Sequence, residues 1–448
     1  MMHLDLCTVG GYNEVGRNMA AVKVNDTAVL LDMGFYMQKI MEFEEEGGHA
    51  AGLSGDRMIK LGIVPDVHVI DAWKSSVRAI ALTHCHFDHI GAVPYLAPFY
   101  PQAPVYGTPF TMAVVRKMMH DEDMFISNPL KTARYNTRIK LSADVEMEYI
   151  YVTHSTPQAS IVVLHTPKGA VVYATDFKLD DHPVLGKAPD YEALNRLADE
   201  KVLALIVDSL YSAAAMKTPS EKVAREMLRE TMLETDNDGC AIVGTCFASH
   251  LARLKSFADF GRTLRRKVVF MGRSMQRYVE AAVELGLVDF PGVELVSYGR
   301  DVKRRLHDIE KRGSEDYAIV CTGGQGERNS VLARMLRKDY PFQFYTDDQV
   351  IFSNKVIPVE PNITNRALIE DELRKKGVRV YKDVHVSGHD SREDIRWLIE
   401  KLEPEHVIPC HGPPNLLEPA CDLAEEMGYT YGKTAHLLGN GGKLKLHY

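Results

Sequence analysis

Short apolar runs along the chain are each followed by polar side chains that can bind a metal ion. The run at residues 79–82 leads directly into Thr83-His84-Cys85-His86-Phe87-Asp88-His89. Runs at 149–152, 170–174, 202–207 and 406–409 end in the same way, at His154, Asp176, Asp208 and His411. Runs of this length predict buried strands, and ligands bind where the ends of such strands share one sheet edge. The pattern therefore predicts a site built from several strand ends.

The rest of the hydrophobic pattern predicts how the chain is divided. Residues 4–34 predict a hairpin region, and the glycines of residues 10–16 predict a tight turn near the rim of the site. Residues 37–60 are acidic and rich in glycine, so we expect a surface loop or lid there. Residues 210–384 alternate between strand-like and helical patterns, which predicts a doubly wound α/β domain. The last stretch, 443–447, predicts a closing strand.

The cluster at residues 84–89 is dense enough to indicate more than one metal ion. Neutral imidazole and carboxylate groups suit zinc or another borderline divalent ion. His84, His86, Asp88 and His89 are too many ligands for one catalytic ion, which must keep open coordination positions. The adjacent Cys85 is interpreted as a small packing residue, and so is Cys410 beside His411.

The composition is typical of a globular protein, and the distribution of charge indicates what kind of partner it binds. The 448 residues are 45% hydrophobic and 25% charged, as in ordinary globular proteins. No apolar run predicts a membrane span, and the N-terminus has no signal-peptide pattern. Seven cysteines without a CxxC pair favour a reducing cytoplasm. The net charge is −8, yet residues 210–384 carry 29 basic and 25 acidic residues, which fits a polyanionic partner there.

Three predicted strands of the middle segment end in small or polar residues, at Thr245, Gly272-Arg273-Ser274 and Gly323-Gly324-Gln325. Backbone N–H groups at such turns suit phosphate oxygens, although ordinary turn chemistry accounts for each of them alone. Two basic clusters, Arg265-Arg266-Lys267 and Lys303-Arg304-Arg305, either contact a nucleic-acid backbone or form solvated helix faces.

Taken together, these residues resemble the metallo-β-lactamase fold, whose HxHxDH signature matches residues 84–89. Within that superfamily the chain is most similar to the ribonuclease J family of the β-CASP branch. The matching phrases are Gly-Thr-Cys-Phe-Ala-Ser at 244–249, Gly-Arg-Ser-Met at 272–275, Thr-Gly-Gly-Gln-Gly-Glu at 322–327 and His-Val-Ser-Gly-His at 385–389. The resemblance implies an α/β protein, with a β-CASP domain (210–384) inserted in an αββα sandwich (1–209 and 385–448).

The resemblance has departures that bear on function. The chain looks like the shorter, archaeal kind of ribonuclease J, without the additional C-terminal domain of most bacterial members. Pro413 stands where the family usually has an acidic residue. DNA-repair relatives tend to lack a histidine at the position of His411, so that histidine favours RNA as the substrate.

The resemblance also implies roles for individual residues. His84, His86 and His154 would hold one zinc ion, Asp88, His89 and His411 a second, and Asp176 would bridge them, with manganese or magnesium as substitutes. The predicted catalytic residues are Asp88, Asp208 and His389, where His389 protonates the leaving oxygen and Asp208 orients it. The predicted RNA contacts are His385, Ser387, Gly388, Gly323, Gly324, Ser249, Arg273 and Ser274. The first three would anchor a 5′-monophosphate, unless they only precede a helix capped by Ser391.

The predicted function is zinc-dependent hydrolysis of single-stranded RNA, mainly as a 5′→3′ exonuclease that prefers 5′-monophosphate ends, with endonuclease activity as well. Such an enzyme would act in RNA processing and decay as a cytoplasmic homodimer. The alternatives are an RNA endonuclease of the polyadenylation-factor type, a small-molecule hydrolase such as a thioesterase or lactonase, and a non-catalytic RNA-binding protein.

Overall fold

The computed structural model describes residues 1–357 and 360–448, which form two compact units. Unit 1 consists of Met1–Asp181, Lys187–Thr218 and Gly388–Tyr448. Unit 2 consists of His182–Gly186 and Pro219–Ser387. Each unit has its own hydrophobic core.

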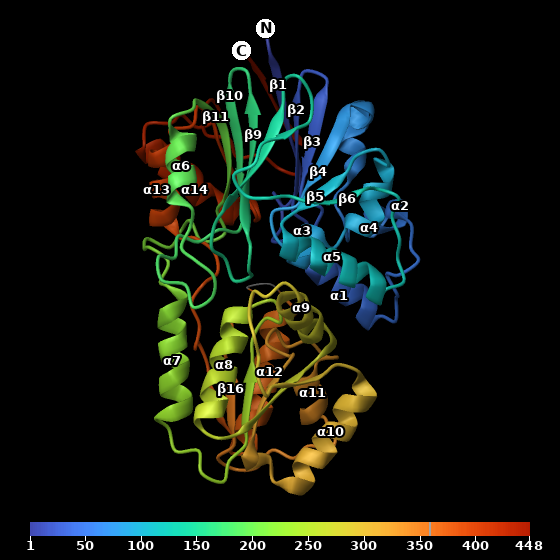
Figure 1. The fold of residues 1–448 in the computed structure, drawn as a ribbon, viewed down its shortest axis with the longest axis vertical. Coiled ribbons are helices and arrows are strands. Elements are labelled where there is room, and N and C mark those ends of the chain that lie inside the picture. The colour runs from blue at the N-terminus through green and yellow to red at the C-terminus, as the bar shows by residue number, and fades with distance from the viewer. Residues whose placement is uncertain (358–359) are drawn as a thin grey trace. The chain divides into compact units, whose positions relative to one another are not determined.

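Unit 1 contains two mixed sheets that pack face to face (Figure 1). The strands of the first sheet, in spatial order, are β19 (Gly442–His447), β1 (His3–Gly10), β2 (Met19–Val24), β3 (Thr27–Leu31), β4 (Val77–Ala81), β5 (Val105–Gly107) and β6 (Leu130–Thr132). Those of the second are β18 (Val407–Cys410), β11 (Val202–Asp208), β10 (Gly169–Ala174), β9 (Ser160–Thr166), β8 (Glu146–Tyr151) and β7 (Ile139–Lys140). Alternate residues of both sheets, such as Val22 and Tyr173, meet in one buried core.

Helices cover the outer faces of these sheets. Apolar residues of α6 (Tyr191–Ala198), α13 (Arg392–Leu402) and α14 (Pro414–Glu426) share a second core with the outer face of the six-stranded sheet. The seven-stranded sheet contacts α5 (Pro109–Asp121) and the 3₁₀ segment η1 (Val67–Ser76). The short helical elements α3 (Phe87–Ile90), α4 (Val93–Leu96) and η2 (Ala97–Phe99) follow β4. The predicted αββα sandwich is thereby confirmed.

The expectation of a surface loop over residues 37–60 is wrong. This segment contains α1 (Met37–Glu45) and α2 (Gly55–Lys60). Glutamate, lysine and methionine favour a helix once an apolar side chain has a core to enter, and Ile40 and Met58 are buried. Ser54 caps α2 by accepting a hydrogen bond from the Arg57 N–H.

Unit 2 is built on a six-stranded parallel sheet, as the doubly wound pattern predicts. Its strands in spatial order are β14 (Glu294–Val296), β13 (Lys267–Met271), β15 (Tyr317–Cys321), β12 (Ile242–Thr245), β16 (Gln349–Phe352) and β17 (Arg379–Tyr381). Its helical elements are α7 (Glu221–Leu233), α8 (Leu251–Thr263), α9 (Arg273–Glu284), α10 (Gly299–Arg312), η3 (Ser314–Asp316), α11 (Val331–Leu336) and α12 (Asn362–Lys375). Because all strands run the same way, their C-terminal ends share one edge of the sheet.

None of the helices in the described parts of the chain is long and apolar enough to cross a membrane.

Candidate metal centre

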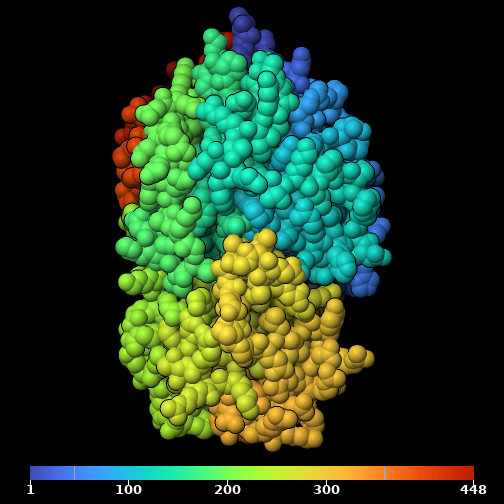
Figure 2. Space-filling view, viewed as in Figure 1, coloured from blue at the N-terminus to red at the C-terminus, as the bar shows by residue number. Residues whose placement is uncertain are grey.

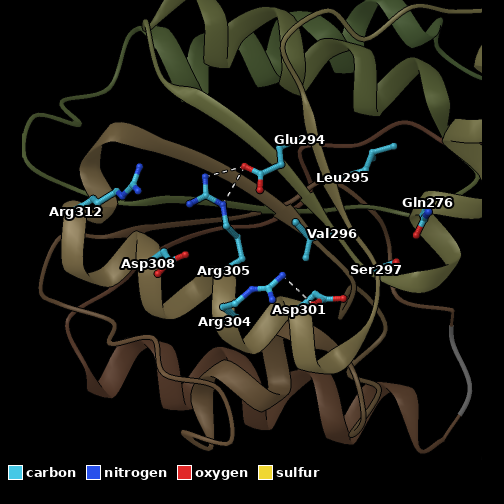
Figure 3. Close-up of a pocket in the computed structure, with 10 residues that line it drawn as sticks. All are labelled: Gln276, Glu294, Leu295, Val296, Ser297, Asp301, Arg304, Arg305, Asp308 and Arg312. Atoms are coloured by element: carbon cyan, nitrogen blue, oxygen red, sulfur yellow. Dashed lines mark hydrogen bonds and ion pairs between the residues drawn. The ribbon is translucent and has the colours of Figure 1, made fainter.

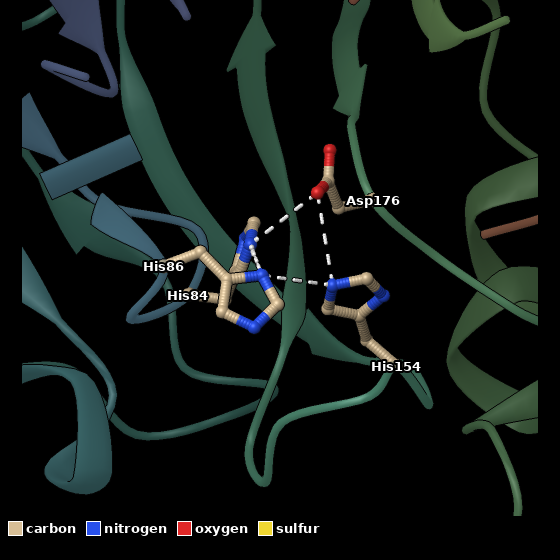
Figure 4. A group of neighbouring side chains, drawn as sticks. All are labelled: His84, His86, His154 and Asp176. Carbon is tan, nitrogen blue, oxygen red and sulfur yellow. Dashed lines mark hydrogen bonds and ion pairs between the residues drawn. The ribbon is translucent and has the colours of Figure 1, made fainter. Parts of the chain in front are cut away.

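Three imidazoles and one carboxylate of unit 1 point toward a common centre (Figure 4). This first ligand group consists of His84, His86, His154 and Asp176. His84 Nε2 and His154 Nε2 lie 3.1 Å and 3.2 Å from His86 Nδ1. Ligand atoms about 2.0–2.1 Å from a tetrahedral zinc ion are about 3.3 Å apart, so the first group has the spacing of a zinc site.

A second ligand group shares one residue with the first and consists of Asp88, His89, Asp176 and His411. His89 Nε2 lies 3.2 Å from Asp176 Oδ1 and 3.6 Å from Asp88 Oδ2. His411 follows β18, and its Nδ1 and Nε2 lie 2.5 Å from Asp176 Oδ1 and 3.4 Å from Asp88 Oδ2. The predicted metal residues are thus gathered around one carboxylate.

Asp176 turns its two oxygens toward different ligand groups. Oδ2 lies 3.5 Å from His84 Nε2 and 3.6 Å from His154 Nε2, both in the first group. Oδ1 faces His89 and His411 of the second group. A buried carboxylate in this position fits the bridge of a two-metal site.

The backbone is strained at three residues of the candidate metal centre and its surroundings. Asp32, Asp176 and His411 have φ angles of 59°, 46° and 72°, which are uncommon for residues with a side chain and cluster at functional sites. The His411 N–H donates a 2.9 Å hydrogen bond to the Gly11 carbonyl. The glycine turn predicted near the site therefore holds one ligand loop in place.

Hydrogen bonds from behind orient the imidazole rings. Asp32 Oδ2 lies 2.8 Å from His89 Nδ1, and the backbone N–H of Thr83 donates to Asp32 Oδ1 at 2.8 Å. The carbonyl of Gly388 lies 2.6 Å from His154 Nδ1. Such partners fix the ring orientation and tautomer of a metal-binding histidine, so that the opposite nitrogen faces the ion.

Sequence reasoning missed two residues of this outer shell, Asp32 and Asn18. Asn18 Nδ2 lies 3.0 Å from His89 Nε2 and 3.3 Å from Asp88 Oδ2. Asp32 directly follows the buried strand β3. The same pattern that pointed to Asp176, a metal-binding residue type at the end of a buried strand, therefore also applied to Asp32. Asn18 has no comparable signal, because it precedes a strand.

The first ligand group holds its histidines neutral. Burial and the neighbouring imidazoles lower the pKa values of His84 and His154 well below the ordinary value. Burial lowers the pKa of His86 to about 4. Neutral imidazole is the form that binds a metal ion, so this group need not lose a proton first at neutral pH.

The second ligand group holds its histidines as cations in the absence of metal. Burial disfavours the charged form, but Asp176 and Asp88 raise the pKa of His89 to about 10. Asp176 likewise raises the pKa of His411 against the effect of burial. The two histidines in turn hold the pKa of Asp176 well below its usual range, although burial opposes this.

His389 and Asp208 stand beside both ligand groups. His389 Nδ1 lies 2.7 Å from Asp208 Oδ2, and His389 Nε2 lies 3.9 Å from Asp176 Oδ2. Although burial opposes protonation, Asp176 and Asp208 raise the pKa of His389. A protonated imidazole held by a buried carboxylate next to a metal centre can act as a general acid.

The predicted 5′-end residues are divided between the units. His385 and Ser387 belong to unit 2, whereas Gly388 belongs to unit 1. A Cβ atom at Gly388 would lie 2.7 Å from Ser155 Cβ, so this position has to be glycine. Ser391 caps α13 through a reciprocal capping box with Asp394, which accounts for the serine but not for the histidines.

The remaining predicted RNA contacts lie after three parallel strands of unit 2. Ser249 follows β12, Arg273 and Ser274 begin α9 after β13, and Gly323 and Gly324 follow β15. Packing alone accounts for both glycines, because added Cβ atoms would lie 2.7 Å from Leu332 Cβ and 2.5 Å from Asn354 Oδ1. A role in phosphate binding remains a prediction for all five residues.

Comparison with protein families agrees with this architecture. Residues 13–212 match the metallo-beta-lactamase superfamily, residues 240–370 match "Ribonuclease J, beta-CASP domain", and residues 378–437 match "Zn-dependent metallo-hydrolase RNA specificity domain". A solved Enterococcus faecalis protein of unknown function has a similar fold, with a TM-score of 0.65 at 17% identity over 99% of this chain and 100% of its own.

Curated relatives extend the similarity over the whole chain. Ribonuclease J of Methanocaldococcus jannaschii is 41% identical and covers 98% of both chains. Ribonuclease J of Pyrococcus abyssi is 40% identical over 98% of this chain and 96% of its own. That of Mycobacterium tuberculosis is 29% identical over 95% of this chain and 72% of its own.

The metal centre and the two units define a metal-dependent nuclease of the metallo-β-lactamase superfamily, β-CASP branch. Identity of this extent over almost the full chain then fixes the family: the chain belongs to the ribonuclease J family. It is accordingly a metal-dependent ribonuclease that acts on RNA. Membership of this family favours a ribonuclease over the thioesterase, lactonase and non-catalytic alternatives.

Proposed function

We propose that the chain hydrolyses RNA phosphodiester bonds at a centre of two zinc ions and degrades RNA in the 5′→3′ direction. The orientation of Asp176 carries the two-ion proposal, because its oxygens face different ligand groups. The first ion would be held by His84, His86 and His154, and the second by Asp88, His89 and His411. Two bound ions would supply hydroxide at neutral pH and offset the charge that develops on the phosphate; manganese or magnesium would serve as substitutes.

Metal analysis of an Asp176→Ala variant tests the two-ion proposal. Wild type should hold two zinc ions per chain, whereas the variant should hold fewer and lose RNA cleavage. Asp144→Ala is a matched control, since Asp144 belongs to the same unit and its carboxylate accepts a hydrogen bond from Asn25, away from both ligand groups. Full activity and two ions in Asp176→Ala would show that Asp176 does not bridge.

In the proposed reaction His389 gives its proton to the leaving 3′-oxygen, and Asp208 holds the ring and stabilises its cationic form. His389→Ala should slow cleavage by about 10²–10⁴-fold. A substrate with sulfur in place of the leaving 3′-oxygen tests the step, because a thiolate leaves without a proton. The variant should recover on that substrate, and an equal loss on both substrates would exclude His389 as the acid.

The direction of degradation and the 5′-end preference rest on resemblance and on the position of His385, Ser387 and Gly388 directly before His389. RNA labelled at a 5′-monophosphate end should release labelled mononucleotide first, whereas early internal fragments would indicate an endonuclease of the polyadenylation-factor type. Ser387→Ala should impair 5′-phosphorylated RNA more than 5′-hydroxyl RNA. Equal impairment would argue against the anchor.

We infer a cytoplasmic location and a homodimer as further parts of this function. Support for the location comes from the seven cysteines, all of which are free thiols. The dimer rests on family resemblance alone, and the mass in solution measured by light scattering tests it.

A further inference from the structure

Helix α10 of unit 2 carries an unbalanced positive charge on its exposed face. Arg300, Lys303, Arg304, His307 and Lys311 are all exposed and follow the i, i+3, i+4, i+7 spacing of one helical face. Its opposite face is apolar and enters the core of unit 2. The sequence of α10 has six basic and three acidic residues, within a chain of net charge −8.

The exposed cations of α12 show what a solvated helix face looks like in the same unit. There Arg374 pairs with Glu370 and Asp371, and Lys375 pairs with Glu372. On α10 only Arg304 and Arg305 have ion-pair partners, Asp301 and Glu294.

Four cations of α10 therefore lack a balancing carboxylate. Across residues 1–357 and 360–448, no carboxylate pairs with Arg300, Lys303, Lys311 or Arg312. Two further acidic groups lie on the helix. Asp308 lines the cavity beside it, and Glu310 is engaged by the Tyr345 hydroxyl at 2.9 Å.

A cavity of about 500 Å³ runs beside this helix and edge strand β14 (Figure 3). Gln276, Ser297, Arg304, Arg305 and Arg312 contribute donor groups to its wall. Figure 3 shows Arg305 held by Glu294, with Arg312 near the far end of the helix. The cavity thus offers hydrogen-bond donors beside the cationic face.

The start of α10 adjoins the sheet edge with the predicted RNA contacts. The Gly272 N–H donates a 2.9 Å hydrogen bond to the Val296 carbonyl, so the ends of β13 and β14 are adjacent. Arg273 is therefore on the same edge as Tyr298, the residue before α10, which is 66% exposed. The yellow and gold surface in Figure 2 belongs to the part of unit 2 that contains α9 and α10. An exposed aromatic ring beside a cationic track is the combination on which single-stranded nucleic acids stack.

We propose that Tyr298 and the basic face of α10 form a second binding site for the backbone of single-stranded RNA, separate from the metal ligands, all of which belong to unit 1. The site rests on the proposed ribonuclease function and deepens it. RNA that is long enough to occupy both sites should therefore bind more tightly than RNA that occupies only one of them.

A charge-reversal variant tests the site. Arg300→Glu, Lys303→Glu and Lys311→Glu are combined, and the control combines Lys222→Glu, Lys338→Glu and Lys375→Glu at exposed positions of the same unit. Binding of 40-nucleotide and 8-nucleotide unstructured RNA is measured in a His389→Ala background at several salt concentrations. The α10 variant should bind the long RNA about tenfold or more weakly at low salt, and its slope of log K against log salt should be smaller by about 2. Binding of the short RNA should not change.

Unchanged binding of the long RNA, equal loss on both lengths, or the same loss in the control would each overturn the site. Tyr298→Ala tests the aromatic contact separately, because it leaves the net charge unchanged. It should weaken binding of the long RNA without changing the slope of log K against log salt. If wild type cleaves no RNA at all, the proposed function fails, while the binding comparison still decides whether α10 is a site.

Discussion

The two ligand groups differ in the charge their histidines carry before any metal ion is bound. Those of the first group are neutral, since burial lowers the pKa of His86 to about 4. Those of the second are cationic, since Asp176 and Asp88 overcome burial and raise the pKa of His89 to about 10. Histidines of the first group are therefore in the neutral form that binds metal, whereas those of the second group must release a proton before they bind it. What decides this is where the carboxylates stand.

Removing one histidine from each group gives the largest expected effect. His86→Ala and His411→Ala should each lose one of two ions and reduce cleavage by about a thousandfold or more, because an ion supplies several kcal/mol. Metal analysis with kinetics checks this. Each variant should keep the ion of the other ligand group. If either variant loses both ions, the two groups do not bind metal independently.

Asp32→Asn should act on the second group alone. Asp32 holds His89 Nδ1 at 2.8 Å, and loss of such a partner weakens metal binding about 10–100-fold. Competition with a chelator measures the affinity of each ion. Asp190→Asn, at the N-cap of α6, is the matched control. Equal weakening of both ions would contradict the division into two groups.

The pH dependence of stability in the metal-free protein should have opposite signs for the two groups. The folded pKa of His86, about 4, is below the ordinary value of about 6.5. The contribution of His86 to the free energy of unfolding is therefore complete above pH 6.5 and is lost as the pH falls toward 4. The folded pKa of His89, about 10, is above the ordinary value. Its contribution is complete below pH 6.5 and is lost as the pH rises toward 10.

Thermal unfolding of His86→Gln and His89→Gln checks these signs. The melting temperature of wild type relative to His86→Gln should fall on acidification, and relative to His89→Gln it should fall on raising the pH, each on the order of 2 °C per pH unit. If the melting temperatures of the two variants change with pH in the same way, the two ligand groups do not differ in the charge of their histidines.

Pro413→Glu should have the smallest effect. The resemblance implies an acidic residue at this position, yet His411 is already held by Asp176 and by the Gly11 carbonyl. A carboxylate before α14 also suits a helix start. Cleavage should change by less than about threefold, within the range of a weak surface interaction. A tenfold gain would show that His411 lacks support in the second group.

Most residues of the candidate centre were predicted from two local signals together, a buried apolar run and a metal-binding residue type directly after it. His154, Asp176 and His411 are far apart in sequence, yet in the structure they belong to two ligand groups that share Asp176. The assignment of His389 to Asp208 came from resemblance, since no local pattern relates residues 181 positions apart.

What the sequence did not show depends on packing between distant segments. Asn18 reaches His89 only because β2 lies next to β3. Residues 37–60 form helices because Ile40 and Met58 become buried. Strand β14 has only three residues, so its periodicity is too short to detect, and α10 was noted only for its charge.

Titration of the metal-free protein with zinc, with protons counted at each step, tests the central claim most directly. At pH 7.5 the first equivalent should release close to no protons, because its histidines are already neutral. The second should release about two, one each from His89 and His411, and cleavage should begin only then. Equal proton release at both steps, or full activity after one equivalent, would contradict the account.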